Sequence, residues 1–172
     1  MQALRAQMNP HFIFNSLNSI NNFILKNESE QASEFLTKFS RLVRQVLQNS
    51  RNKLVSLEDE FSALKLYIEL EQVRFDNKFQ YEIICDNYLD TNLVLIPPLL
   101  IQPYVENAIW HGLMHKETNG SITVKVYQEE EKLFFIIADD GIGRKKAAEY
   151  KSKFGMRKNP WEWILLLIES LF

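Results

Sequence analysis

The chain has 172 residues, a formal net charge of −2 and one cysteine, Cys85. A charge this close to neutral excludes a dedicated nucleic-acid binder, because such proteins carry a basic surplus that neutralises phosphates. A single cysteine excludes an internal disulfide. No apolar run reaches the roughly 18 residues that a membrane-spanning helix needs. We therefore expect a soluble chain with a core that its 12 phenylalanines help to fill.

The first part of the chain is expected to form a helical hairpin. Apolar residues recur at three- and four-residue steps over residues 11–25 and residues 30–48, which predicts two amphipathic helices. Pro10 is expected in the first turn of the first helix. The polar residues 26–29 join the helices through a short turn. One hairpin cannot bury both apolar stripes, so we expect a second copy to complete a four-helix bundle as a homodimer.

The remainder of the chain mixes helices and strands. After a polar linker at residues 49–53, Ser56 is the expected N-cap of a helix, with Asp59 three positions on as a near capping box. Further helices are expected at about residues 99–113 and at residues 145–151. Apolar or alternating segments that predict strands are residues 79–85, 92–96, 121–128 and 132–138.

This order of elements predicts an α+β protein with two units. Residues 1–52 form the expected helical-hairpin unit, and residues 53–172 form the expected α/β sandwich. No internal repeat or low-complexity tract interrupts the order.

His11 directly follows the helix-interrupting Pro10 and stands near the amides of Asn9 and Asn15. Near neutral pH a histidine keeps an unprotonated ring nitrogen that can act as a nucleophile. The other interpretation is a helix histidine that only forms a hydrogen bond with a neighbour, and from chemistry alone that is the more common case.

A second polar group, Glu106, Asn107 and His111, interrupts the otherwise apolar helix of residues 99–113. Asn107 and His111 are four apart and so share a helix face. An amide oxygen suits Mg²⁺, which keeps several waters and bridges substrate phosphates. The alternative is a solvated polar stripe on an amphipathic helix.

A glycine-bearing loop at residues 139–143, Asp-Asp-Gly-Ile-Gly, follows the last predicted strand. Glycine lacks a Cβ atom, so the backbone of such a loop can approach a flat ligand. The carboxylate of Asp139 can accept a hydrogen bond from an exocyclic amine such as that of adenine. Because Asp-Gly alone is a common turn dipeptide, the prediction depends on the loop following the Asn107 helix.

Three ordered segments resemble those of the LytS-like bacterial sensor histidine kinases. Residues 7–20 resemble the H-box, which reads Q-x-N-P-H-F-x-F-N, residues 97–113 resemble the N-box, and residues 139–143 resemble the first glycine box. The helical segment that ends Glu-Leu-Glu-Gln-Val-Arg-Phe at residues 69–75 also resembles the family. The resemblance covers roughly residues 1–145.

The resemblance implies the core of a histidine kinase in a two-component system. His11 would take the γ-phosphate of ATP and pass it to an aspartate of a response regulator, with Glu106 as a second catalytic residue. The implied fold is a dimerisation hairpin followed by a Bergerat-type (GHKL) ATP-binding sandwich. The longer protein would be anchored in a bacterial inner membrane through an upstream segment, with this portion in the cytoplasm.

The resemblance also implies a nucleotide site for ATP and Mg²⁺. Asn107 would be the metal ligand. The residues implied in binding the cofactor are Asn107, His111, Asp139, Gly141 and Gly143, of which Asp139 would accept the adenine amine.

The end of the chain departs from the family pattern. Only residues 144–172 follow the glycine loop and Gly155 is their one glycine, so we expect a sandwich without the lid and second glycine box. Trp110 stands where relatives often carry a basic residue that can touch phosphate. We therefore expect a chain cut short at its C-terminus with weak or absent autokinase activity. Its apolar residues 159–172 should pack on the exposed sheet or make an oligomer contact.

Two other functions stay open from the sequence. One is a dimeric phosphoacceptor and interaction scaffold whose ATP site does not work. The other is an ATPase of the gyrase or chaperone kind, which has no use for a histidine on a dimer helix. Binding of Mg-ATP separates the kinase from the scaffold, and a His11→Gln substitution separates the kinase from the other ATPases.

Overall fold

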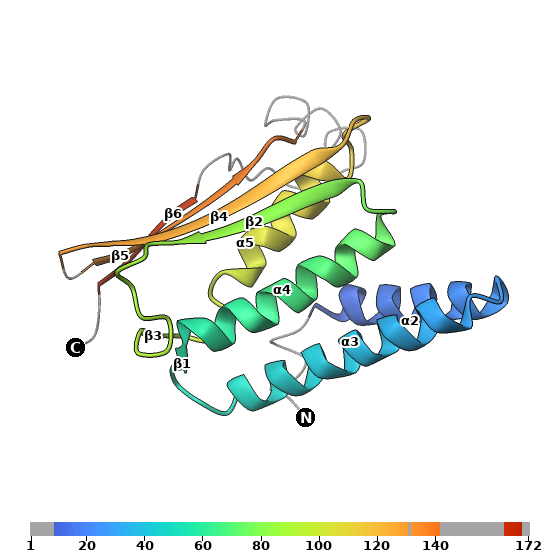
Figure 1. The fold of residues 1–172 in the computed structure, drawn as a ribbon, viewed down its shortest axis with the longest axis horizontal. Helices are drawn as coiled ribbons and strands as arrows, with labels where there is room; N and C mark the ends of the chain where they lie inside the picture. The colour runs from blue at the N-terminus through green and yellow to red at the C-terminus, as the bar shows by residue number, and fades with distance from the viewer. Residues whose placement is uncertain (1–8, 131, 142–163, 170–172) are drawn as a thin grey trace. The chain divides into compact units, whose positions relative to one another are not determined.

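The computed structural model describes residues 9–130, 132–141 and 164–169 (Figure 1). The helices are α2 (Pro10–Leu25), α3 (Ser29–Asn49), α4 (Leu57–Arg74), α5 (Gln102–Asn107) and the π-helix η1 (Ala108–Leu113). The strands are β1 (Val55–Ser56), β2 (Phe79–Cys85), β3 (Leu95–Ile96), β4 (Gly120–Glu129), β5 (Lys132–Asp139) and β6 (Ile164–Glu169). The helix expected at residues 145–151 and the candidate residue Gly143 lie outside the described residues.

Two compact units divide the chain: residues 1–76 with residues 91–100, and residues 77–90 with residues 101–172. The first unit holds α2, α3 and α4, and the second holds the four-stranded sheet with α5 and η1. This division differs from the expected boundary after residue 52, because α4 packs on α3. A helical hairpin followed by a mixed α and β unit confirms the α+β class.

The helical hairpin forms as the sequence predicts. Pro10 is the first residue of α2, and Asn9 is its N-cap, with its Oδ1 accepting a hydrogen bond from His11 N over 3.1 Å. Proline suits this position because the first N–H groups of a helix have no helical acceptor. The turn to α3 passes through Asn27, whose φ of 59° lies in the left-handed region that asparagine tolerates.

α3 and α4 run antiparallel to each other. Gln45 Nε2 donates to Ser62 Oγ over 3.0 Å, and further along Lys38 Nζ lies 3.2 Å from Glu69 Oε2. Residues around most of the circumference of α4 are buried: Leu57, Glu60, Phe61, Ala63, Leu64, Leu66, Tyr67, Ile68, Leu70 and Glu71. A helix that is buried on most sides lies inside a fold, so α4 is central to the first unit.

The start of α4 confirms Ser56 as its N-cap. Ser56 Oγ accepts a hydrogen bond from Asp59 N over 3.1 Å and donates one to Asp59 Oδ2 over 2.8 Å. β1 pairs with β3 in an antiparallel two-stranded sheet, with Val55 opposite Ile96. The strand expected at residues 92–96 is therefore limited to Leu95–Ile96 and belongs to this two-stranded sheet, not to the four-stranded one.

The helix expected at about residues 99–113 begins later and changes type. Leu99 has a φ of 57°, which excludes it from a right-handed helix, and its N–H donates to the buried Glu60 Oε2 over 2.8 Å. α5 begins only at Gln102. η1 follows it, and Met114 N donates to Ile109 O, five residues back, over 2.9 Å, which is the π-helical pattern.

The second unit contains a sheet with the strand order β2-β4-β5-β6 (Figure 1). β2 and β4 are parallel, so the chain must cross over between them, and this crossover carries α5 and η1. β4 and β5 form the expected antiparallel hairpin, and η1 packs against both strands. The buried residues of this hairpin alternate along the strands and are Ile122, Val124, Val126, Leu133, Phe135 and Ile137.

β6 comes from the apolar end of the chain. It pairs antiparallel with β5, with Leu166 opposite Phe135, and is the outermost strand of the sheet. This part of the end segment thus joins the sheet by backbone pairing at its edge. Among the described residues, no helix is both long and apolar enough to cross a membrane.

Candidate functional site

His11 lies on the exposed surface in the first turn of α2. Its backbone is fixed by the Asn9 cap and by the helical position of Pro10. The next residue, Phe12, is only 2% exposed, with its ring centroid 6.2 Å from that of Phe39 on α3 and 5.0 Å from that of Tyr67 on α4. The buried phenylalanine anchors the turn, and the adjacent imidazole is presented to solvent.

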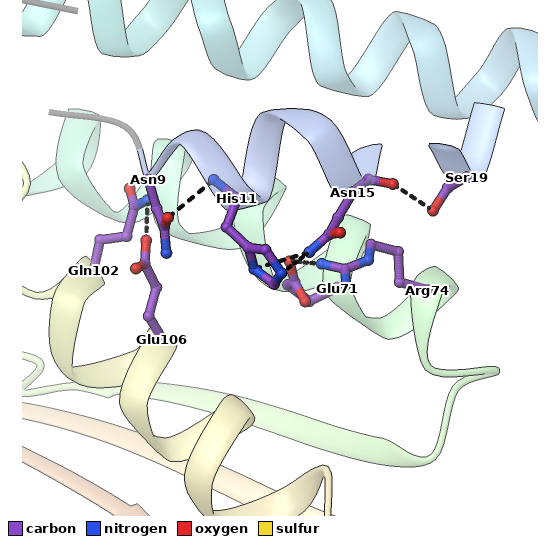
Figure 2. A network of polar contacts seen from close by, with 8 residues as sticks. All are labelled: Asn9, His11, Asn15, Ser19, Glu71, Arg74, Gln102 and Glu106. Atoms are coloured by element: carbon purple, nitrogen blue, oxygen red, sulfur yellow. Dashed lines mark hydrogen bonds and ion pairs between the residues drawn. The ribbon is translucent and has the colours of Figure 1, made fainter. Parts of the chain in front are cut away.

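Asn15 lies one turn after His11 and contacts its ring. Asn15 Nδ2 is 3.0 Å from His11 Nδ1 and 3.2 Å from His11 Nε2, as the dashed lines in Figure 2 show. A neutral imidazole has one nitrogen that can accept this hydrogen bond and one that donates. The amide therefore restrains the ring without by itself deciding which nitrogen carries the proton.

The second candidate group lies where α5 passes into η1. Gln102 is buried, and its Nε2 donates to Glu106 Oε1 over 2.9 Å, so the Glu106 carboxylate is held along the helix (Figure 2). Asn107 and His111 are both exposed, at the end of α5 and within η1. Short π-helical segments occur frequently at functional sites, because the extra residue changes the direction of the side chains that follow.

The glycine loop meets η1 inside the second unit. Asp139 Oδ1 accepts a hydrogen bond from Gly141 N over 2.9 Å. A Cβ atom on Gly112 would overlap Asp139 Oδ1, and one on Gly141 would lie 2.5 Å from the carbonyl carbon of Gly112. Gly112, Asp139 and Gly141 therefore pack so closely that neither glycine can carry a side chain without a shift. The fold thus brings the two sequence motifs of this unit together.

Asp140 performs a different task from Asp139. Its Oδ1 accepts a hydrogen bond from Ser121 N over 2.7 Å and lies 3.1 Å from Lys116 Nζ. Burial by itself raises the pKa of Asp140, but the Ser121 hydrogen bond and the Lys116 ammonium outweigh it and lower the pKa. Asp140 therefore fastens the glycine loop to the start of β4 as an ionised carboxylate.

The candidate residues are divided between the two compact units. His11 belongs to the first unit, while Glu106, Asn107, His111, Asp139 and Gly141 belong to the second. The contact of Gly112 with Asp139 was not expected from the sequence. That contact joins residues far apart in the chain. The presence of Gly112 and Gly141 in the two motifs was the one sequence signal that could have indicated it.

Comparison with known proteins finds relatives of this chain. Residues 1–79 match the model of the family described as Histidine kinase. The chain is 37% identical over 143 residues to "Sensor protein LytS" of Staphylococcus haemolyticus, covering 83% of this chain and 24% of that protein. It is 38% identical over 148 residues to "Sensor histidine kinase/phosphatase LytS" of Staphylococcus aureus, covering 85% of this chain and 25% of that protein.

A solved structure is also similar to the chain. The histidine kinase domain of a blue-light-activated histidine kinase from Erythrobacter litoralis is 14% identical, with a TM-score of 0.44, covering 84% of this chain and 81% of that one. The chain spans about a quarter of the length of its LytS relatives. Over most of its own length, the chain is therefore a homologue of the LytS-type sensor histidine kinases.

Proposed function

We propose that this chain is the core of a sensor histidine kinase, which phosphorylates His11 at the expense of ATP and transfers the phosphoryl group to an aspartate of a response regulator. The observation that carries the proposal is the packing of Gly112 against Asp139 and Gly141. This packing brings Gly112 of the N-box segment against the glycine loop, which supports one shared ATP site of the Bergerat type. The homology to LytS proteins supports the same function.

The residues of the second unit suit a nucleotide. Gly112 and Gly141 pack closely beside Asp139, whose carboxylate can accept the exocyclic amine of a base. His111 and the held Glu106 would line the phosphate end. We also assign Gly143 to this pocket, from the resemblance alone.

Asn107 is the proposed magnesium ligand. Within the described ranges, no group of three histidine, cysteine, aspartate or glutamate side chains could hold a metal ion by itself. Mg²⁺ is usually bound through few protein ligands together with waters and substrate phosphates, so the exposed amide of Asn107 suits it. Bound Mg-ATP would supply the phosphoryl group and neutralise its charge.

His11 would perform the chemical step. Its unprotonated ring nitrogen forms a bond to the γ-phosphorus while the phosphorus–oxygen bond to ADP breaks, and the ring then loses its N–H proton. Its exposed place beside the buried Phe12 leaves one face open to a phosphoryl donor and then to a receiver domain. We also propose that residues 1–52 serve dimerisation and phosphotransfer and that residues 53–172 serve ATP binding, with α4 packed on the hairpin.

A second copy of the chain is the proposed partner of the hairpin. Large apolar side chains stay exposed along it: Phe14, Leu17, Ile24 and Leu25 on α2, and Leu36 and Leu47 on α3. Burial of such side chains between two hairpins contributes about 25 cal/mol for each Å² removed from water. A four-helix bundle of two copies would bury both stripes.

A scaffold function is the second candidate. Two observations favour it. Gly155 is the one glycine after Gly143, so these residues contain no second glycine-rich motif, and β6 pairs with the edge of β5. As a scaffold, the chain would receive the phosphate on His11 from an intact partner.

We also propose, from the LytS homology, that the longer protein is a bacterial inner-membrane sensor with this portion in the cytoplasm.

Calorimetric titration with Mg-ATP tests the proposed function. The kinase predicts saturable binding that weakens at least about tenfold in an Asn107→Ala variant, since loss of one charge-assisted contact costs about 1.5–3 kcal/mol. Asn92→Ala, which changes an amide of the first unit, is the matched control and should bind like the original chain. Absence of binding by the original chain would favour the scaffold.

A further inference from the structure

The polar pair Glu71–Arg74 near the end of α4 has no task in the function proposed so far. Arg74 Nη1 lies 2.6 Å from Glu71 Oε1, and the two side chains are only 10% and 0% exposed. A buried ion pair loses its hydration on both sides and often adds little net stability compared with an apolar pair. Its presence inside a helical core therefore calls for a role other than stability.

The pair belongs to the same region as His11. Phe12 of α2 contacts Tyr67 of α4, and Glu71 follows Tyr67 by one helical turn on the same face. α4 and α2 are both antiparallel to α3, so they run in the same direction, and Asn15 and Ser16 likewise lie one turn beyond His11 and Phe12. Figure 2 shows His11 and Asn15 pointing from α2 toward the Glu71–Arg74 pair on α4.

The ring of His11 needs a group that selects its proton position. Asn15 Nδ2 is within hydrogen-bond distance of both ring nitrogens, at 3.0 and 3.2 Å. Which nitrogen of a histidine stays unprotonated is set by the partner of the other nitrogen, and a carboxylate favours the tautomer whose N–H faces it. Glu71 is a buried carboxylate on the side of His11 that faces α4.

We propose that Glu71, held in place by Arg74, is a positioning residue that selects the ring nitrogen with which His11 attacks phosphorus. This inference deepens the proposed function and rests on His11 being the phosphoacceptor. Arg74 fixes the carboxylate, the carboxylate favours one tautomer of the imidazole, and Asn15 donates to the nitrogen that remains unprotonated.

Nitrogen-15 NMR of the histidine-labelled chain tests the tautomer directly and needs no ATP. The His11 signal is assigned by its absence from a His11→Gln variant. We expect one tautomer to dominate in the original chain and a mixture in Glu71→Gln. Glu69→Gln is the matched control, because Glu69 is also a glutamate of α4 but pairs at the surface with Lys38. An unchanged tautomer ratio in a folded Glu71→Gln variant would overturn the proposal.

Phosphoramidate provides a chemical readout that bypasses the nucleotide site. The unprotonated nitrogen of His11 forms a bond to phosphorus, the phosphorus–nitrogen bond of the reagent breaks, and ammonia leaves with the proton that the ring releases. We expect Glu71→Gln to be labelled about 10- to 100-fold more slowly, or on the other ring nitrogen, because misplacement of a reacting group costs rate on this scale. Equal rates and the same phosphohistidine isomer in Glu71→Gln and Glu69→Gln would contradict the proposal.

A double variant keeps the test valid if Glu71→Gln does not fold, since that change leaves Arg74 buried without its counter-charge. Replacing Glu71 and Arg74 together by methionine removes both charges at similar volume, which cores usually tolerate. The double variant should show the same tautomer mixture. If the chain is labelled by phosphoramidate but not by Mg-ATP, the kinase function is rejected and the positioning role of Glu71 stands. Failure of the kinase function can thus be told apart from failure of the positioning role.

Discussion

The two compact units build their candidate sites in different ways. In the first unit, Asn9, Pro10, His11, Phe12 and Asn15 are close in sequence, and one helix start places them. In the second unit, Gly112 and Asp139 come from η1 and the end of β5, and only the folded sheet brings them together. A site whose residues all lie at one helix start should therefore tolerate substitutions elsewhere in the chain. A site whose residues come from distant segments should not.

The largest effect is expected where the first unit depends on a tertiary contact. Phe12→Ala removes a ring that is packed against Phe39 and Tyr67 and should lower the free energy of unfolding by about 3–5 kcal/mol. Urea unfolding followed by circular dichroism measures this loss. Leu93→Ala is the control at an exposed position of the same unit outside the hairpin, and it should cost less than about 1 kcal/mol. Similar losses for both would mean that Phe12 is no anchor.

The close packing of the second unit predicts the next effect. Gly112→Ala would force Asp139 or the backbone of Gly141 to shift, so we expect a loss of about 1–3 kcal/mol in stability, together with weaker Mg-ATP binding. Gly120→Ala is a graded control, because its Cβ atom would meet the flexible end of Leu113 and lie 3.1 Å from Asp140 Oδ1 rather than meet backbone. Thermal unfolding and calorimetry of both variants decide whether the Gly112 contact matters more, and equal effects would contradict the assembled site.

The exposed apolar stripe of the hairpin predicts self-association. Phe14→Glu should shift the chain from dimer to monomer in analytical ultracentrifugation, because it places a charge among Leu17 and the other apolar residues of the proposed interface. Tyr88→Glu, at another highly exposed aromatic position outside the hairpin, should leave the mass unchanged. A monomeric original chain would reject the homodimer.

The smallest effect concerns Asp140 and depends on pH. Its pKa is lowered below the ordinary value of 3.8, so its contribution to stability is present above about pH 4 and is lost as the pH falls through the folded-state pKa. Because half of the side chain is exposed, the contribution should be about 1 kcal/mol or less. Urea unfolding of Asp140→Asn should show a deficit at pH 7 that shrinks as the pH falls below about 4. A constant deficit would assign the effect to packing.

Local signals predicted much of the fold. Pro10 and Ser56 marked two helix starts, and apolar or alternating segments marked β4 and β5, because these signals depend only on nearby residues. The start of α5 was wrong because it depends on Leu99 donating to Glu60, a contact between residues far apart in sequence. The edge position of β6 was likewise set by a distant partner, β5.

The candidate sites show the same limit. The H-box could be found from sequence because residues 7–20 resemble the family motif, and the four-residue spacing of His11 and Asn15 fits their contact on one helix face. The contact of Gly112 with Asp139 and the burial of the Glu71–Arg74 pair could not, since packing alone decides them. A motif shows which residues matter, whereas the fold shows which residues they touch.

The most direct test of the proposed function is incubation of the chain with [γ-³²P]ATP and Mg²⁺, beside a His11→Gln variant. His11 is exposed, so its replacement should leave the fold intact. The account predicts slow incorporation of an acid-labile, alkali-stable phosphate that is absent from the variant. Equal incorporation in both chains, or none in a folded original chain, would contradict His11 as the site of autophosphorylation.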